Sequence, residues 1–387
     1  MPAPVKLSAK GLRRLQAGHP WIYRDELTGL KPEHHGALVT VHDPEGQFLA
    51  SGFGSSRSKI AVRILTRSRS LPDRDFFKQA IHRAGERRKG KIRKDTAVRL
   101  VNAEGDLLPG LVADWYAGQM VVQCLIAGTD ILREMFAEIL WEEFSPDGLW
   151  FRNDASSREL EGLAQEKFFW RGKEIPEVVV KEGGLQFLVN LLEGHKTGSY
   201  LDQAGNREGA AKFAGGKCLD AFCFQGGFAL HLAGKASEVL AIDSSQPALS
   251  LLEKNLALNS IKNVSTMRAN IFDILPELAG QGERFNLIVL DPPPFAKSRN
   301  DLAQARKGYR ELNRRAISLL HPGGILITYS CSFHFSLAEL MDTAQRAAAD
   351  NGRQARLLEI HSQSADHPIL LSMPESWYLK GLVLEVD

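Results

Sequence analysis

The spacing of apolar residues changes along the chain and divides it into three segments. In residues 1–70, short apolar runs are separated by turns rich in Gly, Pro and Asp. Runs of this length and composition are typical of strands. The predicted strands cover residues 37–42, 48–53 and 60–65. We therefore expect a small all-β domain at the N-terminus.

The second segment, residues 71–185, begins with a linker helix. Apolar residues recur at helical spacing from residue 73, and the pattern dissolves into Arg and Lys before residue 93. Strands are predicted over residues 98–102, 111–115, 120–126 and 148–152, with a helix over 130–144 between them. This order predicts a central α+β domain.

The third segment, residues 186–387, alternates strands with helices. The predicted strands cover residues 217–221, 238–243, 264–269, 285–290 and 324–329. The predicted helices cover residues 228–232, 245–259, 309–320 and 337–349. Such alternation predicts an α/β domain built on a doubly wound, mostly parallel sheet.

Charge and composition narrow the classes of protein. The 387 residues carry a formal charge of +2, but residues 1–100 hold 21 Lys and Arg against 9 Asp and Glu. A basic N-terminal segment predicts a module that binds a polyanion, although residues 83–94 alone are equally explained as a solvated helix face.

Because no apolar stretch approaches ~20 residues and no secretory signal is apparent, we expect a cytoplasmic protein without membrane contact. The four cysteines lack metal-ligand spacing, so neither a metal site nor disulfides are expected.

Acidic residues end the first two strands of the third segment. Asp220 precedes a glycine turn, which lets the backbone approach a ligand at the carboxyl edge of the sheet. Asp243 ends the second strand, where a carboxylate accepts hydrogen bonds from ribose hydroxyls. The turn lacks G-x-G-x-x-G, which counts against a pyrophosphate ligand. Together these features favour S-adenosylmethionine, although each acidic residue taken singly also suits a turn or a helix N-cap. The predicted cofactor-binding residues are Asp220, Phe222, Gly226, Gly227, Asp243, Asn270, Asp273 and Asp291.

Cys331 is the candidate nucleophile. Methylation of cytosine at C5 requires prior addition of a nucleophile at C6, and a thiolate is suited to that step. Of the four cysteines, only Cys331 follows the carboxyl end of a predicted strand, where ligands bind in open α/β sheets. Cys124 and Cys218 are expected in the core, and Cys223 is expected to line the cofactor pocket.

The run Asp-Pro-Pro-Pro-Phe at residues 291–295 predicts a base-binding loop beside Cys331. Pro292 and Pro293 fix the backbone, so carbonyl groups and the Asp291 carboxylate face the polar edge of a base stacked on Phe295. Asp291 or a water is expected to remove the C5 proton. Lys297 and Arg299 are placed to hold phosphates near the target nucleotide.

Two alternatives stay open at this point. The same loop serves enzymes that methylate exocyclic amines, in which case Cys331 is structural. The chain could instead be a non-catalytic RNA-binding or assembly factor. The intact pair Asp220 and Asp243 argues against that second alternative.

Blocks of sequence in a fixed order resemble those of bacterial large-subunit ribosomal RNA cytosine-C5 methyltransferases that carry an N-terminal PUA domain. The blocks are residues 18–23, 104–111, 158–163, 196–203, 220–227, 290–295, 309–313, 330–332 and 378–380. The likeness covers nearly the whole chain. Three positions depart from the pattern, with Pro294 in place of Lys, Ser199 in place of an aromatic residue and Ala204 in place of Arg. They bear on the target nucleotide more than on the reaction.

The resemblance implies a PUA domain, a central α+β domain and a class I, Rossmann-like methyltransferase domain. It also implies S-adenosylmethionine as methyl donor and Cys331 as covalent nucleophile, with Thr197, Tyr200 and Gln203 bordering the cofactor pocket. The implied substrate is 23S ribosomal RNA, either naked or in a pre-ribosomal particle. Whether the chain forms a homodimer is left open.

Overall fold

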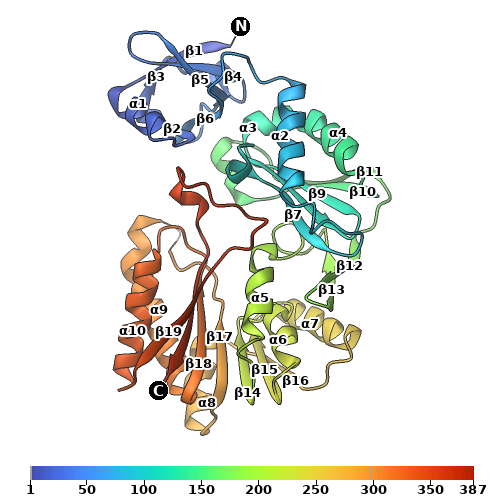
Figure 1. Ribbon diagram of the computed structural model, residues 1–387, viewed down its shortest axis with the longest axis vertical. Coiled ribbons are helices and arrows are strands. Elements are labelled where there is room, and N and C mark those ends of the chain that lie inside the picture. Colours follow the sequence, from blue (N-terminus) through green and yellow to red (C-terminus); the bar gives the residue numbers. More distant parts are fainter. Residues whose placement is uncertain (1, 297) are drawn as a thin grey trace. The chain divides into compact units, whose positions relative to one another are not determined.

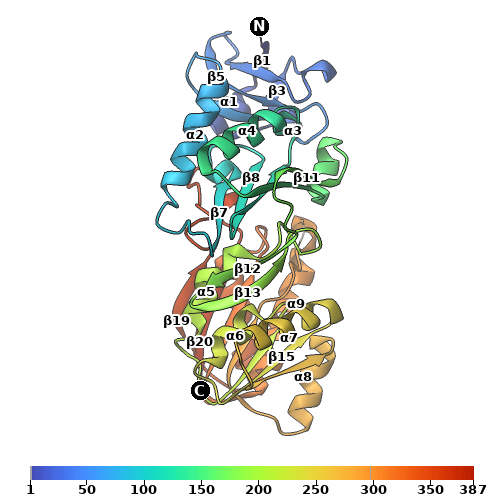
Figure 2. The same cartoon turned by 90° about the vertical axis from the view of Figure 1, so that its right-hand side faces the viewer.

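A computed structural model describes residues 2–296 and 298–387, which form two compact units (Figures 1 and 2). Unit 1 comprises Met1–Val180, Val189–Leu201 and Asp366–Ser376, and unit 2 comprises Lys181–Leu188, Asp202–Ala365 and Trp377–Asp387. Each unit thus gathers segments from distant parts of the sequence. The domain boundaries at residues 70 and 185 stay predictions.

The N-terminal part of unit 1 is a six-stranded sheet with the order β2-β6-β5-β4-β1-β3. Its strands are β1 (Ala3–Leu7), β2 (Trp21–Tyr23), β3 (Leu27–Thr28), β4 (Leu38–His42), β5 (Phe48–Gly54) and β6 (Ile60–Thr66). The last three confirm the strands expected from the apolar runs. The all-β prediction omitted helix α1 (Ala9–Gln16), which begins where the Ser8 hydroxyl accepts a hydrogen bond from the amide of Gly11.

The rest of unit 1 is built on a five-stranded sheet with the order β11-β10-β9-β8-β7. Its strands are β7 (Ala97–Asn102), β8 (Leu111–Tyr116), β9 (Gln119–Cys124), β10 (Gly148–Asn153) and β11 (Glu166–Gly172). Helices α2 (Arg74–Glu86), α3 (Ala127–Ile131) and α4 (Arg133–Phe144) pack against it. Helix α2 starts after the N-cap Asp73 and ends seven residues earlier than predicted, because the residues that follow supply no apolar face.

Unit 2 contains a seven-stranded sheet with the order β16-β15-β14-β17-β18-β20-β19. Its strands are β14 (Lys217–Ala221), β15 (Glu238–Asp243), β16 (Val264–Arg268), β17 (Phe285–Leu290), β18 (Leu320–Ser330), β19 (Ala355–Ser362) and β20 (Lys380–Val386). The first five pair in parallel, which confirms the predicted sheet. Strand β20 then pairs antiparallel with both β18 and β19, an edge that the sequence pattern did not predict. The pair β12 (Glu177–Glu182) and β13 (Leu185–Asn190) forms a separate hairpin.

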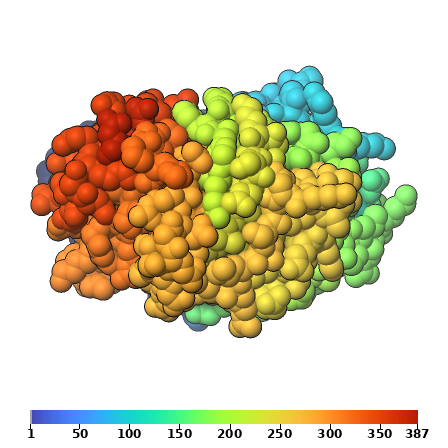
Figure 3. Space-filling view, turned by 90° about the horizontal axis from the view of Figure 1, so that it is seen from below, coloured from blue at the N-terminus to red at the C-terminus, as the bar shows by residue number. Residues whose placement is uncertain are grey.

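Helices cover both faces of this sheet. Figure 1 shows α5, α6 and α7 on one face and α8, α9 and α10 on the other. Their bounds are α5 (Ala204–Ala210), α6 (Gly227–Ala233), α7 (Gln246–Leu258), α8 (Ile271–Gly280), α9 (Leu302–Ser318) and α10 (Leu337–Asp350). Seen from below, the yellow to red segments form a closed surface at the end of unit 2 that carries α8 (Figure 3). The carboxyl ends of β14, β15, β17 and β18 lie at the other end of the parallel strands, because the four run in one direction.

Candidate active site

Three carboxylates converge at the carboxyl ends of neighbouring strands in unit 2. Ala221 on β14 pairs with Ile242 on β15 and with Leu290 on β17, so Asp243 and Asp291 come next on either side of the end of β14. Asp220 lies one residue earlier on β14, within electrostatic reach of both. A site that gathers this much negative charge is suited to a cationic ligand.

The Asp220 carboxyl is enclosed and only half satisfied. The side chain is 1% exposed, its Oδ2 accepts a hydrogen bond from the amide of Ala229 at 2.8 Å, and its Oδ1 has no hydrogen-bond partner among the described residues. Burial, with the charges of Asp291 and Asp243, raises the pKa of Asp220 to about 8. A buried acceptor without a donor is costly, and an ammonium group would satisfy it. Asp220 therefore fits the methionine end of the predicted cofactor.

The turn that follows β14 has a backbone shape that few residues tolerate. Phe222 and Phe224 have φ values of +67° and +48°, and Gly226 has φ of +84°. A Cβ on Gly226 would lie 2.1 Å from Cδ1 of Leu252. The turn is held by Asp243, whose carboxylate accepts hydrogen bonds from the amides of Phe224 (2.9 Å) and Ser245 (2.8 Å). Asp243 thus ties the ends of β14 and β15 together while part of its surface stays exposed.

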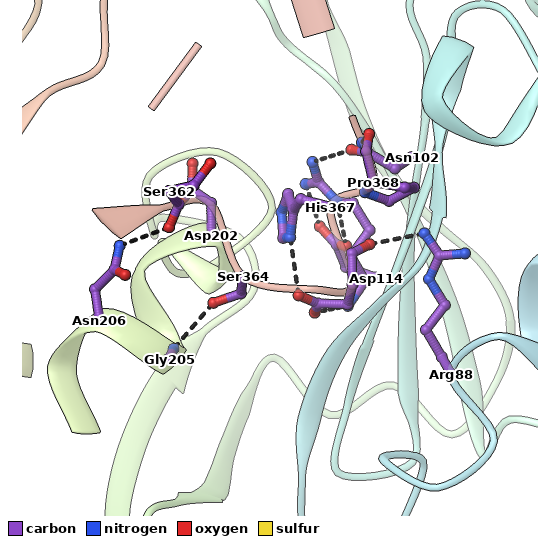
Figure 4. A network of polar contacts seen from close by, with 12 residues as sticks. Arg88, Asn102, Asp114, Asp202, Gly205, Asn206, Ser362, Ser364, His367 and Pro368 are labelled. Carbon is purple, nitrogen blue, oxygen red and sulfur yellow. Dashed lines mark hydrogen bonds and ion pairs between the residues drawn. The ribbon is translucent and has the colours of Figure 1, made fainter. Parts of the chain in front are cut away.

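Gln203 supplies a second unsatisfied group in unit 2. Its side chain is buried, Oε1 accepts a hydrogen bond from Nδ2 of Asn206 at 2.6 Å, and Nε2 has no partner among the described residues. Asn206 in turn donates to the carbonyl oxygen of Ser362, and the amide of Gly205 donates to the hydroxyl of Ser364 (Figure 4). The start of α5 is therefore fixed to the end of β19, which holds Gln203 in place.

Thr197 and Tyr200 belong to unit 1. The Thr197 hydroxyl is fully buried, donates to Oδ2 of Asp114 at 2.6 Å and lies 2.8 Å from the hydroxyl of Tyr116. Tyr200 contacts the His195 ring through its hydroxyl at 3.1 Å. The Thr197 hydroxyl is thus committed to the polar network that includes Asp114, part of which appears in Figure 4. That Thr197 and Tyr200 border the cofactor stays a prediction.

The residues predicted at the adenine edge lie where α8 begins. Asn270 is the N-cap of α8 and accepts a hydrogen bond from the amide of Phe272 at 2.9 Å, and Asp273 is exposed in the first turn. Capping accounts for Asn270 without any ligand, so the contact of these two residues with a cofactor stays a prediction.

The structure brings Cys331 next to the proline loop. Leu290 pairs with Thr328, so the loops after β17 and β18 leave the sheet side by side. The Cys331 thiol lies 3.9 Å from the carbonyl oxygen of Pro292, and the Ser332 hydroxyl donates to the carbonyl oxygen of Ala296. The thiol and the base-binding loop predicted from sequence thus share one end of the sheet.

Cys331 also differs from the other three cysteines in exposure. Cys124, Cys218 and Cys223 are buried, whereas Cys331 is partly exposed. Burial raises the pKa of each of the three buried thiols. A thiol must reach its substrate and lose its proton to act as a nucleophile, and Cys331 alone is accessible.

Within the proline loop, Pro292 is buried, whereas Pro293 and Pro294 are exposed. Phe295 is half buried, with its ring centroid 4.6 Å from that of Tyr309 and 6.0 Å from that of Phe272. The ring therefore packs against two aromatic side chains of unit 2. Its use as a stacking surface for a base stays a prediction. Lys297 lies outside the described residues, as does the side chain of Arg299.

Two buried cations escaped the sequence reasoning. Arg207 donates to both carboxylate oxygens of Glu182 at 2.6 Å, and a Cβ on Gly227 would lie 2.6 Å from Cδ of Arg207. Lys380 donates from Nζ to the carbonyl oxygens of Ser332 and Phe335. Lys380 stands in the last block of the resemblance, which assigned it no role, and no spacing rule connects it to Cys331.

Residues 2–296 and 298–387 contain no group of three or more His, Cys, Asp or Glu side chains arranged to hold a metal ion. None of the helices over that range is long and apolar enough to cross a membrane.

The chain is similar to known protein families and to known proteins over most of its length. Residues 5–67 match the PUA-like domain family, and residues 164–357 match the family of S-adenosylmethionine-dependent methyltransferases. The chain is 39% identical to ribosomal RNA large subunit methyltransferase I of Aeromonas hydrophila subsp. hydrophila over 99% of both chains. It is 37% identical to the protein of the same name from Photobacterium profundum over 99% of this chain and 98% of that one.

The chain belongs to the family of S-adenosylmethionine-dependent methyltransferases. Its cofactor is S-adenosylmethionine, which agrees with the unsatisfied Asp220 and the carboxylates around it. A methyltransferase structure from Streptococcus mutans has the same fold, with a TM-score of 0.85 at 18% identity over 99% of this chain and all of that chain. A structure solved in complex with SAH gives a TM-score of 0.87 with the same identity and coverage. The class I methyltransferase fold and the PUA-like domain predicted from sequence are confirmed.

Proposed function

We propose that this S-adenosylmethionine-dependent methyltransferase forms 5-methylcytosine in large-subunit ribosomal RNA through a transient bond between Cys331 and C6 of the base. The observation that carries the proposal is the position of Cys331. Its partly exposed thiol lies against the carbonyl oxygen of Pro292, after the carboxyl end of β18 and on the edge of the sheet where β14 and β15 carry Asp220 and Asp243. The relatives named ribosomal RNA large subunit methyltransferase I support the choice of RNA.

The proposed reaction uses the residues in a fixed order. The Cys331 thiolate adds to C6, and the electron pair displaced from the C5–C6 double bond makes C5 nucleophilic. S-adenosylmethionine would supply the sulfonium methyl group to C5, and S-adenosylhomocysteine would leave as the thioether. A base then removes the proton from C5, the double bond forms again, and the thiolate leaves C6. We assign the proton to Asp291 or to a water beside it, because the Asp291 carboxylate comes directly after β17, next to the loop that contacts Cys331.

The proline loop is proposed to hold the target base. Pro292 and Pro293 present no backbone N–H, so the loop offers acceptors to the exocyclic amine of cytosine. Phe295 rests on Tyr309 and is proposed to stack against the base, and Lys297 and Arg299 are proposed to contact phosphates. The PUA-like domain at residues 5–67 and the basic first hundred residues are proposed to bind the RNA outside the target nucleotide.

Two substitutions test the covalent route. Cys331→Ala should lower the rate of methyl transfer by at least about a thousandfold. The affinity for S-adenosylmethionine should stay unchanged, because the thiol is not proposed to bind the cofactor. Cys218→Ala, in the buried cysteine on β14, is the matched control and should stay active. Transfer is measured with labelled cofactor, and affinity is measured by calorimetry. An RNA that carries 5-fluorocytidine at the target should form a covalent conjugate with the wild-type protein, because the fluorine cannot leave as a proton does.

Near-normal turnover by Cys331→Ala would refute the covalent route. Digestion of the product RNA and mass spectrometry identify the modified nucleoside. 5-Methylcytidine supports the proposal, whereas N4-methylcytidine would favour transfer to the exocyclic amine with Cys331 as a structural residue.

A further inference from the structure

We propose that Lys380 is the positioning residue for Cys331, and that its buried ammonium holds the Cys331 loop and favours the thiolate. The catalytic role of Lys380 rests on the proposed function, because it requires Cys331 to be the nucleophile. The pairing of ammonium and thiol is a property of the protein alone, so it can be tested without RNA and without cofactor.

Lys380 reaches Cys331 from the neighbouring antiparallel strand. It is the first residue of β20 and pairs with Ser330, the last residue of β18, so its side chain starts beside the point where the Cys331 loop leaves the sheet. The side chain is 3% exposed. The backbone position and the enclosure together direct the ammonium into the loop rather than into solvent.

The ammonium of Lys380 binds the loop at two points that follow the thiol in the chain. Nζ donates to the carbonyl oxygen of Ser332 at 2.7 Å and to that of Phe335 at 2.9 Å. An ammonium has three N–H donors, and the described residues provide two hydrogen-bond acceptors, so one donor remains. Cys331 directly precedes Ser332 and interacts electrostatically with Lys380. The remaining donor is therefore available to a thiolate at position 331.

The positive charge of Lys380 persists at neutral pH. Burial lowers the pKa of Lys380 to about 8, while the negative charge of an ionised Cys331 and that of the Glu339 carboxylate act in the opposite direction. Among residues 2–296 and 298–387, Lys380 forms no ion pair with a carboxylate. Burying a cation on two neutral carbonyl groups costs free energy, which a nearby anion would recover. The thiolate form of Cys331 is that anion.

Several other ionisable groups described around this corner are paired or neutral. The groups on the packed elements are Asp291 after β17, Arg306 and Tyr309 on α9, Tyr329 on β18, Glu339 on α10 and His361 on β19. Glu339 pairs with Arg306 at 2.6 Å, and burial raises the pKa of Tyr309 and of Tyr329, which keeps both phenols uncharged. His361 lies 2.8 Å from the Tyr329 hydroxyl. Asp291 is the carboxylate assigned above to the C5 proton, and Lys380 is a buried cation whose charge acts on Cys331.

The test compares alkylation of Cys331 in Lys380→Met and Lys380→Arg with the wild type. Iodoacetamide reacts with thiolate, and the three other cysteines are buried, so the rate at Cys331 is followed against pH by mass spectrometry of its peptide. In the wild type we expect half-maximal rate below the ~8.5 of a free thiol. Lys380→Met should move this midpoint upward by about one pH unit or more, and Lys380→Arg should restore most of the difference. A purely structural role would not separate the two variants by charge.

A wild-type midpoint at or above that of a free thiol would overturn the inference, even if both variants fail to fold. Equal midpoints for Lys380→Met and the wild type would overturn it as well. The outcome is independent of the proposed function, because loss of the 5-fluorocytidine conjugate would refute covalent catalysis while leaving the alkylation profile as it is.

Discussion

The buried carboxyl of Asp220 links cofactor binding to pH. Its pKa is raised from the model-peptide range near 4 to about 8, because the ionised form loses hydration and faces two other carboxylates. Between these values the folded protein holds a proton that the unfolded chain has released. The free energy of unfolding of the cofactor-free protein therefore falls as pH rises through this window and levels off above about pH 8. A bound ammonium opposes this effect by stabilising the ionised form.

Asp220→Asn should remove this dependence on pH. Without cofactor, the melting temperature of the variant relative to the wild type should increase from about pH 5 to about pH 8.5, because only the wild type ionises at this position. With saturating S-adenosylmethionine the wild type should have the higher melting temperature, since the amide of the variant cannot pair with an ammonium. Thermal unfolding at several pH values, with and without cofactor, measures both effects. Parallel pH profiles for the two proteins would show that Asp220 does not titrate in this range.

At the scale of elements, the turn between β14 and α6 is the most constrained backbone of the cofactor site. Gly226→Ala would place a methyl group 2.1 Å from Leu252 and 2.8 Å from Leu230, at a φ of +84°. We expect a loss of about 2–4 kcal/mol in the free energy of unfolding and a weaker affinity for the cofactor. Gly280→Ala is the matched control. Gly280 ends α8 with no atom within 4 Å of the added methyl group, so the change should be neutral or stabilising by up to about 1 kcal/mol.

Denaturant unfolding and calorimetry with S-adenosylmethionine test this pair of variants. If Gly226→Ala matched Gly280→Ala in both measurements, the turn would be able to relax, and its shape would not limit cofactor binding.

The elements that the sequence predicted are those whose order follows from local pattern. Strands β14 to β18 are apolar runs bounded by turns, and the acidic residues at their ends were placed by parallel pairing alone. Helix α8 was missed because Pro276 interrupts its pattern. Strand β19 was missed because it leaves Leu357, Leu358 and Ile360 exposed, with no alternation that marks a buried face. The local pattern of apolar residues does not predict elements whose formation depends on tertiary contacts.

The same distinction holds for the candidate site. The proximity of Cys331 to the proline loop follows from two strand ends in one parallel sheet, and the sequence predicted it. The approach of Lys380 to that loop depends on the antiparallel insertion of β20 between β18 and β19, which no short-range signal announces. The unsatisfied atoms of Asp220 and Gln203 likewise become visible only once the surrounding side chains are in place.

At the scale of the whole molecule, the excess of Lys and Arg in the first hundred residues is only partly available to a polyanion. Arg87 and Arg88 both bind Asp106, and Arg88 is 2% exposed, so these two serve the structure of unit 1. Lys91 and Lys94 follow α2 and are exposed. The basic run therefore divides into arginines that pair with Asp106, of which Arg88 is buried and Arg87 exposed, and exposed lysines that can meet phosphate.

Neutralising Lys91 and Lys94 together should weaken RNA binding in a salt-dependent way. If both lysines contact phosphates, the slope of log affinity against log salt concentration should fall by about 1.4–1.8, which corresponds to two released counterions. Lys254→Gln with Lys262→Gln removes two exposed lysines of unit 2, on α7 and in the loop after it, and controls for the change in net charge. Binding is measured by fluorescence anisotropy across a salt series, with S-adenosylmethionine affinity expected to stay constant in both double variants. An equal change of slope in the two would mean that net charge, rather than the exposed end of the basic run, governs the interaction.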